Sequence, residues 1–531
     1  MKKNLASVSI AIGILLSRIM GLVRERVFAY YLGNSDAAGA FRAALRIPNL
    51  LQNLFGEGVL SASFIPVYAK LLEEGKKEEA GRAASVVLTL LVLVTALLVI
   101  IGVTFSRPLI EILAPGFHGE VRELTVRMVA IMFPGTGLLV LSAWCLGVLN
   151  SHRKFFLSYV APVLWNLAII VILVGIGGYY LVNRPGAQTR LVIWVAWSTV
   201  IGATLQWGVQ FPYALKLNGV FTLSLKTRLA PVQKIITRFV PAVVTRGVVQ
   251  LSAYIDQVLA SYLGPASVAA MAYAQTIYTL PVSLFGMAIS SAALTEMSRT
   301  TGTKDEIVQA LAARLNSGIR RIAFFVVPSA VAFVVLGDVV TATLFQTGRF
   351  GGSDSRFVWF ILAGSAVGLV ATTQSRLFIS AFWALGNTRT PLGIACFRVA
   401  LTALLGFFVV FPVRSFFALD AIYCSAALTA SAGIAGWIEF LLFRYALTAS
   451  IGQFNLGGRM IMALWGIALA SAALVLGVKL LLPGLHVVFR GIVILGLYGL
   501  LYLGGAILAG IPEAAEAIRT IRRYLSSIKL G

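Results

Sequence analysis

The chain of 531 residues is 59% hydrophobic and only 12% charged, a composition that excludes an ordinary soluble protein and is typical of a polytopic membrane protein. Its 43 lysines and arginines against 20 acidic residues give a formal net charge of +23. The basic residues lie between hydrophobic segments instead of forming one soluble basic domain, so we expect no nucleic-acid partner.

The first predicted element is a helix from Met1 to Leu32, interpreted as an uncleaved transmembrane segment because no signal-peptidase cleavage pattern follows its apolar run. It carries four charged residues: Arg18, Arg24, Glu25 and Arg26. Because successive helical residues turn by about 100°, these four cover too wide an arc for one groove. We expect Arg18 and Arg24 to face a cavity while Arg26 reaches the membrane interface; a bend near Gly21 is the alternative.

The second predicted helix, which ends near Tyr68, carries polar residues on one face. They are spaced three or four apart: Arg42, Arg46, Asn49, Asn53 and Glu57. A lone charge at mid-bilayer costs several kcal/mol, roughly 2.5–3.5 on insertion scales, so such residues usually line a wet cavity. The alternative is a set of structural ion pairs, Arg18 with Glu25 and Arg46 with Glu57. Arginines outnumber glutamates here, which favours a positive cavity that attracts an anion.

Uncharged stretches long enough to cross a membrane recur along the chain. They are 83–106, 128–151, 155–183, 191–215, 357–375 and 491–512. Together with the charged helices they predict an all-α polytopic membrane protein with 14 transmembrane helices. Placing both termini in the cytoplasm puts most lysines and arginines in cytoplasmic segments, as expected for a membrane protein.

Short motifs recur in the same order at an offset of about 230 residues. The pairs are 29–33 with 260–264, 54–58 with 284–288, 107–117 with 338–350, and 213–217 with 445–449. This repetition predicts two six-helix lobes related by a parallel repeat, plus two C-terminal helices. The predicted parts are an N-terminal lobe (1–217), a basic cytoplasmic linker (218–233), a C-terminal lobe (234–449), the two extra helices (450–511) and an amphipathic cytoplasmic tail helix (512–531).

The second lobe is less basic in the region that corresponds to the arginine face. Gln275 lies there, while Arg246 and Gln250 share one stripe of an earlier helix, and we include all three as candidate substrate contacts. Asp256 is a weak candidate for cation binding; a structural, hydrogen-bonded role is the preferred interpretation. Arg376 and Arg398 are further intramembrane charges. No cofactor is expected, and a coupling ion stays unassigned.

Prolines within predicted spans, Pro48 and Pro281 among them, indicate either hinges or fixed kinks. The three cysteines, Cys145, Cys396 and Cys424, fall within predicted spans and indicate neither disulfides nor a metal cluster.

Several longer motifs carry a family resemblance. They are SRIMGLVRE (17–25), AFRAALRIPNLLQNLFGEGVLSASFIPV (40–67), APGF (114–117), YIDQVLASYL (254–263), LPVSLFGMAIS (280–290) and LFQTGRF (344–350). They resemble the MviN/MurJ lipid II flippases of the multidrug/oligosaccharidyl-lipid/polysaccharide exporter superfamily. The resemblance implies transport of the undecaprenyl-diphosphate-linked peptidoglycan precursor from the inner to the outer leaflet of the bacterial cytoplasmic membrane, with no catalytic step.

The resemblance also carries residue roles. The family's cavity arginines correspond to Arg18 and Arg24, its acidic position to Glu57, and its Pro-Asn pair to Pro48 and Asn49. Three positions depart from the family pattern: Gln52 and Gln275 stand in place of arginines, and Gly39 in place of an aspartate. Arg42, Arg46 or Arg246 could compensate for the missing arginines.

The resulting hypothesis is a flippase that works by alternating access through an arginine-lined cavity. Its partners would be a lipid-linked anionic substrate and membrane lipid, and we expect a monomer near cell-wall synthesis proteins. The alternatives are a flippase for another polyprenyl-diphosphate-linked oligosaccharide, a MATE-like exporter, a membrane enzyme acting on lipid-linked sugars, and a non-transporting scaffold. A cation exporter would need cavity carboxylates, whereas arginine dominates here.

Overall fold

The computed structural model describes residues 2–180, 186–219, 221–297, 304–454, 457–482 and 484–519, and these are almost entirely helical. Within this part of the chain, pairing of β type is limited to one isolated bridge between Thr347 and Phe350. The contacts divide the chain into two compact units, Met1–Ala269 with Thr347–Phe350, and Ala270–Gln346 with Gly351–Gly531.

Unit 1 begins with α1 (Lys2–Leu32) and α2 (Asp36–Phe55). The Ser35 hydroxyl oxygen accepts a hydrogen bond from the Ala38 amide at 3.3 Å, which caps the start of α2. The second predicted helix is not continuous, because α2 ends at Gly56 and is followed by α3 (Glu57–Ser63) and α4 (Ile65–Glu73). A Cβ at residue 56 would lie 2.1 Å from the Gln52 carbonyl oxygen, so this break requires glycine. The break is at Gly56 and not at Pro48, through which α2 continues.

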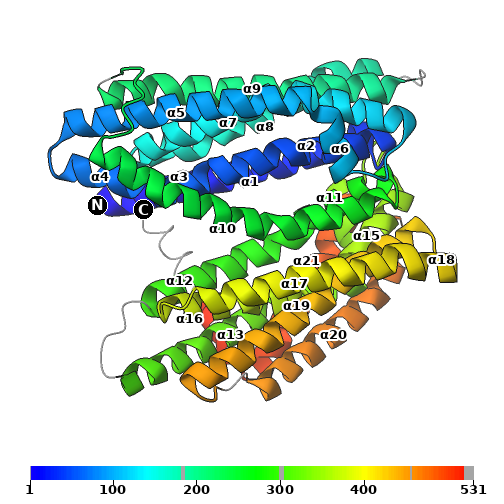
Figure 1. Ribbon diagram of the computed structural model, residues 1–531. Helices are drawn as coiled ribbons and strands as arrows, with labels where there is room; N and C mark the ends of the chain where they lie inside the picture. Colours follow the sequence, from blue (N-terminus) through cyan, green and yellow to red (C-terminus); the bar gives the residue numbers. More distant parts are fainter. Residues whose placement is uncertain are drawn as a thin grey trace. The chain divides into compact units, whose positions relative to one another are not determined.

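Long helices make up the rest of unit 1 (Figure 1). They are α5 (Lys77–Thr104), α7 (Gly119–Ser151), α8 (Phe155–Tyr180), α9 (Ala187–Asn218) and α10 (Ala230–Ser261), with the short α6 (Ser106–Leu113) after α5. Helix α7 packs against both α5 and α9, and α8 packs against α1 and α9. Trp144 of α7 is fully buried and donates its indole N–H to the Ala84 carbonyl at 3.1 Å, which fixes α7 on α5.

Helix α10 packs on α2 and α3 and therefore belongs to unit 1. Residue 234, the predicted start of the second lobe, lies inside α10, and the lobe boundaries inferred from the repeat stay a prediction. Near the end of unit 1, a Cβ at Gly39 would lie 2.1 Å from the Pro265 carbonyl oxygen. This contact gives a physical reason for the glycine that stands where the family pattern has aspartate.

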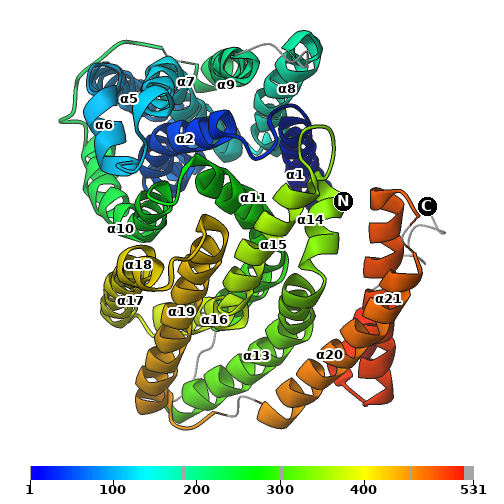
Figure 2. The same ribbon diagram turned by 90° about the vertical axis from the view of Figure 1, so that its right-hand side faces the viewer.

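Unit 2 holds most of α11 and all helices after it (Figure 2). They are α11 (Pro265–Pro281), the π-helix η1 (Val282–Met287), α12 (Ala288–Met297), α13 (Lys304–Val335), α14 (Gly337–Phe345), α15 (Gly352–Ala366), α16 (Leu369–Ala384), α17 (Arg389–Phe408), η2 (Val409–Val413), α18 (Arg414–Phe417), α19 (Ala421–Ile451), α20 (Gly458–Leu481) and α21 (Val487–Leu508). Pro281 lies where the α-helical pattern changes to η1. Residues 512–519 of the predicted tail helix are helical, and 520–531 lie outside the described residues.

Helix α21 is attached to α13 where a proline has removed a backbone donor. Pro328 has no N–H, so the Phe324 carbonyl four residues earlier loses its helical partner. The Tyr502 hydroxyl donates to that carbonyl at 2.7 Å, and the Tyr498 hydroxyl donates to the Pro328 carbonyl at 2.9 Å. In an apolar surrounding, pairing such groups removes a large desolvation cost.

Ten described helices are long and apolar enough to cross a membrane, and an eleventh span arises if α15 and α16, bent by 46°, count as one. The expected all-helical polytopic class is thus confirmed at this coarser level. Cys145, Cys396 and Cys424 lie within helices α7, α17 and α19 as free cysteines.

Candidate functional site

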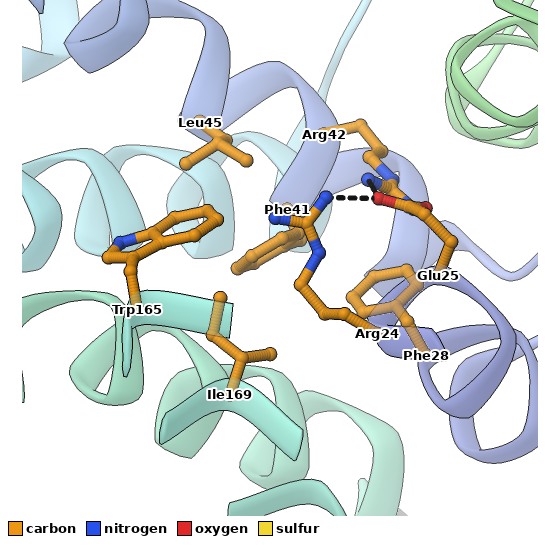
Figure 3. Close-up of a pocket in the computed structure, with 8 residues that line it drawn as sticks. All are labelled: Arg24, Glu25, Phe28, Phe41, Arg42, Leu45, Trp165 and Ile169. Atoms are coloured by element: carbon orange, nitrogen blue, oxygen red, sulfur yellow. Dashed lines mark hydrogen bonds and ion pairs between the residues drawn. The ribbon is translucent and has the colours of Figure 1, made fainter. Parts of the chain in front are cut away.

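The most strongly charged buried cluster in unit 1 is centred on Glu25 of α1, whose side chain is 5% exposed. Arg42 of α2 donates to Glu25 Oε1 at 3.1 Å and forms a second, shorter contact with Oε2. Arg24 contacts Oε1 at 2.5 Å (Figure 3). The planar guanidinium group suits this double contact, because it presents two parallel N–H groups to a carboxylate.

Aromatic rings hold both guanidinium groups in place. The central carbon of the Arg42 guanidinium lies 4.4 Å from the centre of the Phe28 ring, and that of Arg24 lies 4.9 Å from the Trp165 ring. These distances are within the range of favourable cation–π contacts. Trp165, on α8, was not predicted as a site residue. It lies in a largely apolar stretch, so only its being a tryptophan could have indicated a role in the site. A tryptophan alone does not distinguish a site residue from a packing residue.

A pocket opens beside this cluster and contains about 220 Å³ of space free of protein atoms. It is lined by Arg24, Glu25, Phe28, Phe41, Arg42, Leu45, Trp165 and Ile169 (Figure 3). Two arginines and one glutamate give this lining a formal charge of +1. That space includes volume open to solvent, and its enclosed part has room for about one water molecule. An anion such as a phosphate would therefore enter only if the arginine side chains move.

The ion pair predicted between Arg18 and Glu25 is corrected, because Glu25 pairs with Arg24 and Arg42. Arg18 is exposed on α1 and does not line the pocket. The second predicted ion pair, between Arg46 and Glu57, stays a prediction because the Glu57 side chain is outside the described residues.

Arg46 lies one turn after Arg42 on α2 and is half-buried. Its guanidinium carbon is 5.7 Å from the centre of the Tyr254 ring of α10, and the Tyr254 hydroxyl donates to the Arg46 carbonyl at 2.9 Å. Asn49 is half-buried and Asn53 is exposed further along the same face. The face predicted from spacing is present on α2, but its residues do not all reach the pocket.

The remaining predicted residues are not among those that line this pocket. Gln250 is half-buried on α10, and the Arg246 side chain is outside the described residues. Gln275 belongs to unit 2, where its side-chain amide donates to the Thr279 hydroxyl at 3.3 Å. Asp256 is half-buried on α10, and no three His, Cys, Asp or Glu side chains gather to hold a metal in the part of the chain that the structure describes.

A second buried ion pair lies in unit 2. Arg398 of α17 donates to Glu439 of α19 at 3.0 Å, and the Glu439 side chain is 5% exposed. Nearby on α16, the Thr372 hydroxyl is hydrogen-bonded to Tyr278 at 2.9 Å, and Arg376 follows one turn later with an exposed side chain. Glu439 was not predicted, although a single acidic residue within an apolar span is a usable signal.

A family model described as lipid II flippase MurJ matches residues 28–496 of the chain. A probable lipid II flippase MurJ from Rhizobium tropici is 31% identical over 429 residues, covering 80% of this chain and 76% of the relative. The lipid II flippase MurJ of Burkholderia cenocepacia is 31% identical over 434 residues, covering 81% of this chain and 80% of the relative.

Solved structures show similarity of fold. A lipid II flippase MurJ in an inward closed conformation has a TM-score of 0.76 at 23% identity, covering 94% of this chain and 98% of that chain. An inward-facing multidrug resistance transporter of the MATE family has a TM-score of 0.62 at 19% identity, covering 84% and 98%.

Proposed function

Because the chain belongs to the lipid II flippase MurJ family, we propose that it moves the undecaprenyl-diphosphate-linked peptidoglycan precursor from the inner to the outer leaflet of the bacterial cytoplasmic membrane. This is a family of transporters and not of enzymes. The match over most of the chain and the relatives that carry this name support the proposal. Peptidoglycan biosynthesis is the process that such transport would serve.

The proposed topology has 14 spans with both termini in the cytoplasm. Eleven spans follow from composition, and we add α1, the segment α2–α4 and α10. These three segments carry intramembrane charges of unit 1. The motif repetition supports an arrangement of two six-helix lobes and two C-terminal helices, and the bias of basic residues supports the orientation.

The observation that carries the proposed site is the pocket in which Arg24 and Arg42 share Glu25. Glu25 holds both guanidinium groups at one depth, and the formal charge of +1 attracts an anion. An entering phosphate oxygen would compete with the carboxylate for the same N–H groups, which bind phosphate in the same two-pronged way. We propose that this pocket binds one phosphate of the diphosphate while the lipid tail stays in the membrane.

Arg42 is the proposed substitute for the arginine that the family pattern places at Gln52. It shares a carboxylate with Arg24, whereas Gln52 lies at the Gly56 break, where its carbonyl accepts the Gly56 amide at 2.8 Å. The other proposed substrate contacts are Arg18, Arg46, Asn49, Asn53, Glu57, Arg246, Gln250 and Gln275. Alternation of the two lobes would expose this cavity to each side in turn, and the membrane potential, worth about 2.3 kcal/mol per charge and 100 mV, could return it when empty.

The direct test replaces Arg24 and Arg42 singly by alanine and by lysine in cells depleted of their own flippase, with membrane accumulation measured for each variant. We expect both alanine variants to fail to support growth, and Arg42→Lys to be impaired because lysine cannot make the double contact. Arg107→Ala is the matched control, since Arg107 is 55% exposed and pairs with Glu123 at 2.7 Å. Normal growth with membrane-inserted Arg24→Ala and Arg42→Ala would reject the site.

A flippase for another polyprenyl-diphosphate-linked oligosaccharide would use the same phosphate contacts. Competition separates the two candidates: purified protein in nanodiscs should bind lipid II, and the same polyprenyl diphosphate with a different sugar should compete weakly. Equal competition would assign the specificity to the diphosphate alone. Binding of an organic cation in preference to either lipid would instead favour a MATE-like exporter.

A further inference from the structure

The connection between α9 and α10 carries an exposed apolar strip. Residues 221–226 are without helix, and Phe221, Leu223 and Leu225 are 51%, 75% and 60% exposed. These three occupy alternate positions, and alternate side chains share a side wherever the chain is extended. Three large apolar side chains on one side of a connection are unusual in water, because each would normally be buried.

This strip lies beside the apolar part of α5. The Ser224 amide donates to the Thr89 hydroxyl at 3.4 Å, and Leu229 packs against Ala83 and Val86. Arg82 is the last charged residue of α5, so its hydrocarbon-compatible part begins at about residue 83. Thr89 is seven residues further, about 10 Å along the helix. The connection therefore runs along α5 at about the depth to which interfacial segments insert.

Basic residues flank the strip on a surface without acidic neighbours in sequence. Lys226 and Arg228 follow it directly, and Lys234 and Arg238 lie on the first turns of α10. All four side chains are exposed. No acidic residue occurs between positions 217 and 255. Val232 and Ile235 are buried, which turns the four basic side chains away from the protein core.

We propose that residues 221–238 form a docking surface for anionic phospholipid, with Phe221, Leu223 and Leu225 among the acyl chains and Lys226, Arg228, Lys234 and Arg238 at the phosphates. The position of the strip along α5 allows its apolar side chains to contact acyl chains, and the four basic side chains complement the negative charge of the phosphates. In the proposed topology this is the cytoplasmic leaflet. The surface binds bulk lipid and does not depend on transport.

The first experiment measures depth. In full-length protein carrying Cys396→Ser, which removes the exposed native cysteine, a spin label is placed at Leu223→Cys or, as the matched control, at Thr222→Cys on the opposite side of the extended segment. In vesicles containing phosphatidylglycerol, we expect the label at 223 to collide with oxygen and to be shielded from a water-soluble nickel reagent, and the label at 222 to show less shielding. A label at 223 as open to nickel as that at 222 overturns the proposal.

The second experiment counts retained lipid by native mass spectrometry with phosphatidylglycerol or phosphatidylcholine as the probe. Lys226→Gln with Arg228→Gln should weaken phosphatidylglycerol retention by about fivefold for each charge removed. The control, Lys70→Gln with Lys76→Gln, removes two exposed charges that pair with Glu74 and should have little effect. Unchanged retention in the first variant, equal retention of both lipids by the unmodified protein, or one-for-one displacement by lipid II overturns the proposal, the last because the surface would then belong to the substrate.

Discussion

Two buried glutamates, Glu25 in unit 1 and Glu439 in unit 2, show how the same side chain can form ion pairs of different composition. Each glutamate forms an ion pair with arginine, and each glutamate side chain is 5% exposed. Glu25 contacts two guanidinium groups, both packed on aromatic rings beside a pocket. Among the described residues, Glu439 is paired with Arg398, and the exposed Arg376 lies on another helix. We propose that the first glutamate belongs to an anion site, whereas the contact of the second ties α17 to α19.

The largest expected effect separates these roles at Glu25. Glu25→Gln leaves two buried guanidinium groups without their carboxylate, which should lower the free energy of unfolding by about 3–5 kcal/mol and abolish complementation. Thermal unfolding in detergent and growth of flippase-depleted cells measure the two effects. The control Glu123→Gln, in a pair with both side chains more than half exposed, should change neither. A fully active Glu25→Gln protein would remove the distinction between the two glutamates.

The corresponding change in unit 2 should affect stability alone. Glu439→Gln is expected to lower the free energy of unfolding by about 2–3 kcal/mol, less than at Glu25 because Arg398 is 31% exposed. Transport per membrane-inserted molecule should stay near that of the unmodified protein, measured by complementation normalised to protein level. Loss of transport at normal stability would instead place Glu439 in the functional machinery.

A smaller effect is expected at the ring that holds Arg24. Trp165→Leu keeps an apolar side chain but removes the cation–π contact, worth about 0.5–1 kcal/mol at such a site. Affinity for the diphosphate lipid should fall about two- to fivefold in a nanodisc binding assay, with stability nearly unchanged. Trp194→Leu, at a tryptophan that is 45% exposed, is the matched control. An equal loss in the two variants would mean that Trp165 acts through general packing.

The smallest expected effect is the change of stability with pH that His152 causes. His152 lies at the end of α7, and its Nε2 is 3.1 Å from the Tyr68 hydroxyl. Burial, and to a smaller extent the charge of Lys77, lowers the pKa of His152. The folded protein thus binds this proton less readily than the unfolded chain, so stability is complete above the unfolded pKa of about 6.5 and decreases below it. Unfolding curves at pH 5.5 and 7.5 should differ by less than about 1 kcal/mol, and His152→Gln should reduce that difference. An undiminished difference in the variant would assign it to other groups.

Helical spacing alone determines which residues of α2 share a side, so the shared side of Arg42, Arg46, Asn49 and Asn53 was predictable, whereas Glu57 lies beyond the break, on α3. The sequence did not predict which of them would pair with Glu25, since pairing depends on how α1 and α2 pack. Trp165 was missed for the same reason, and Gln275 falls in the other unit. The break at Gly56 was overlooked although two glycines flank Glu57, because the regular spacing from Arg42 to Glu57 suggested an uninterrupted helix.

The apolar stretches predicted the helical class, while the two-lobe arrangement inferred from the motif repeat stays a prediction. Neither could predict that α10 packs on α2 and α3, since sequence alone does not determine which contacts each helix makes. Family motifs predicted the biological role more securely than the individual contacts.

The contact between Gly39 and the Pro265 carbonyl limits how this chain can be altered. No side chain fits at residue 39 while that backbone stays where it is, so a Gly39→Asp substitution would displace the entry to α11. Chimeras between this protein and its relatives should therefore exchange the segments around residues 39 and 265 together.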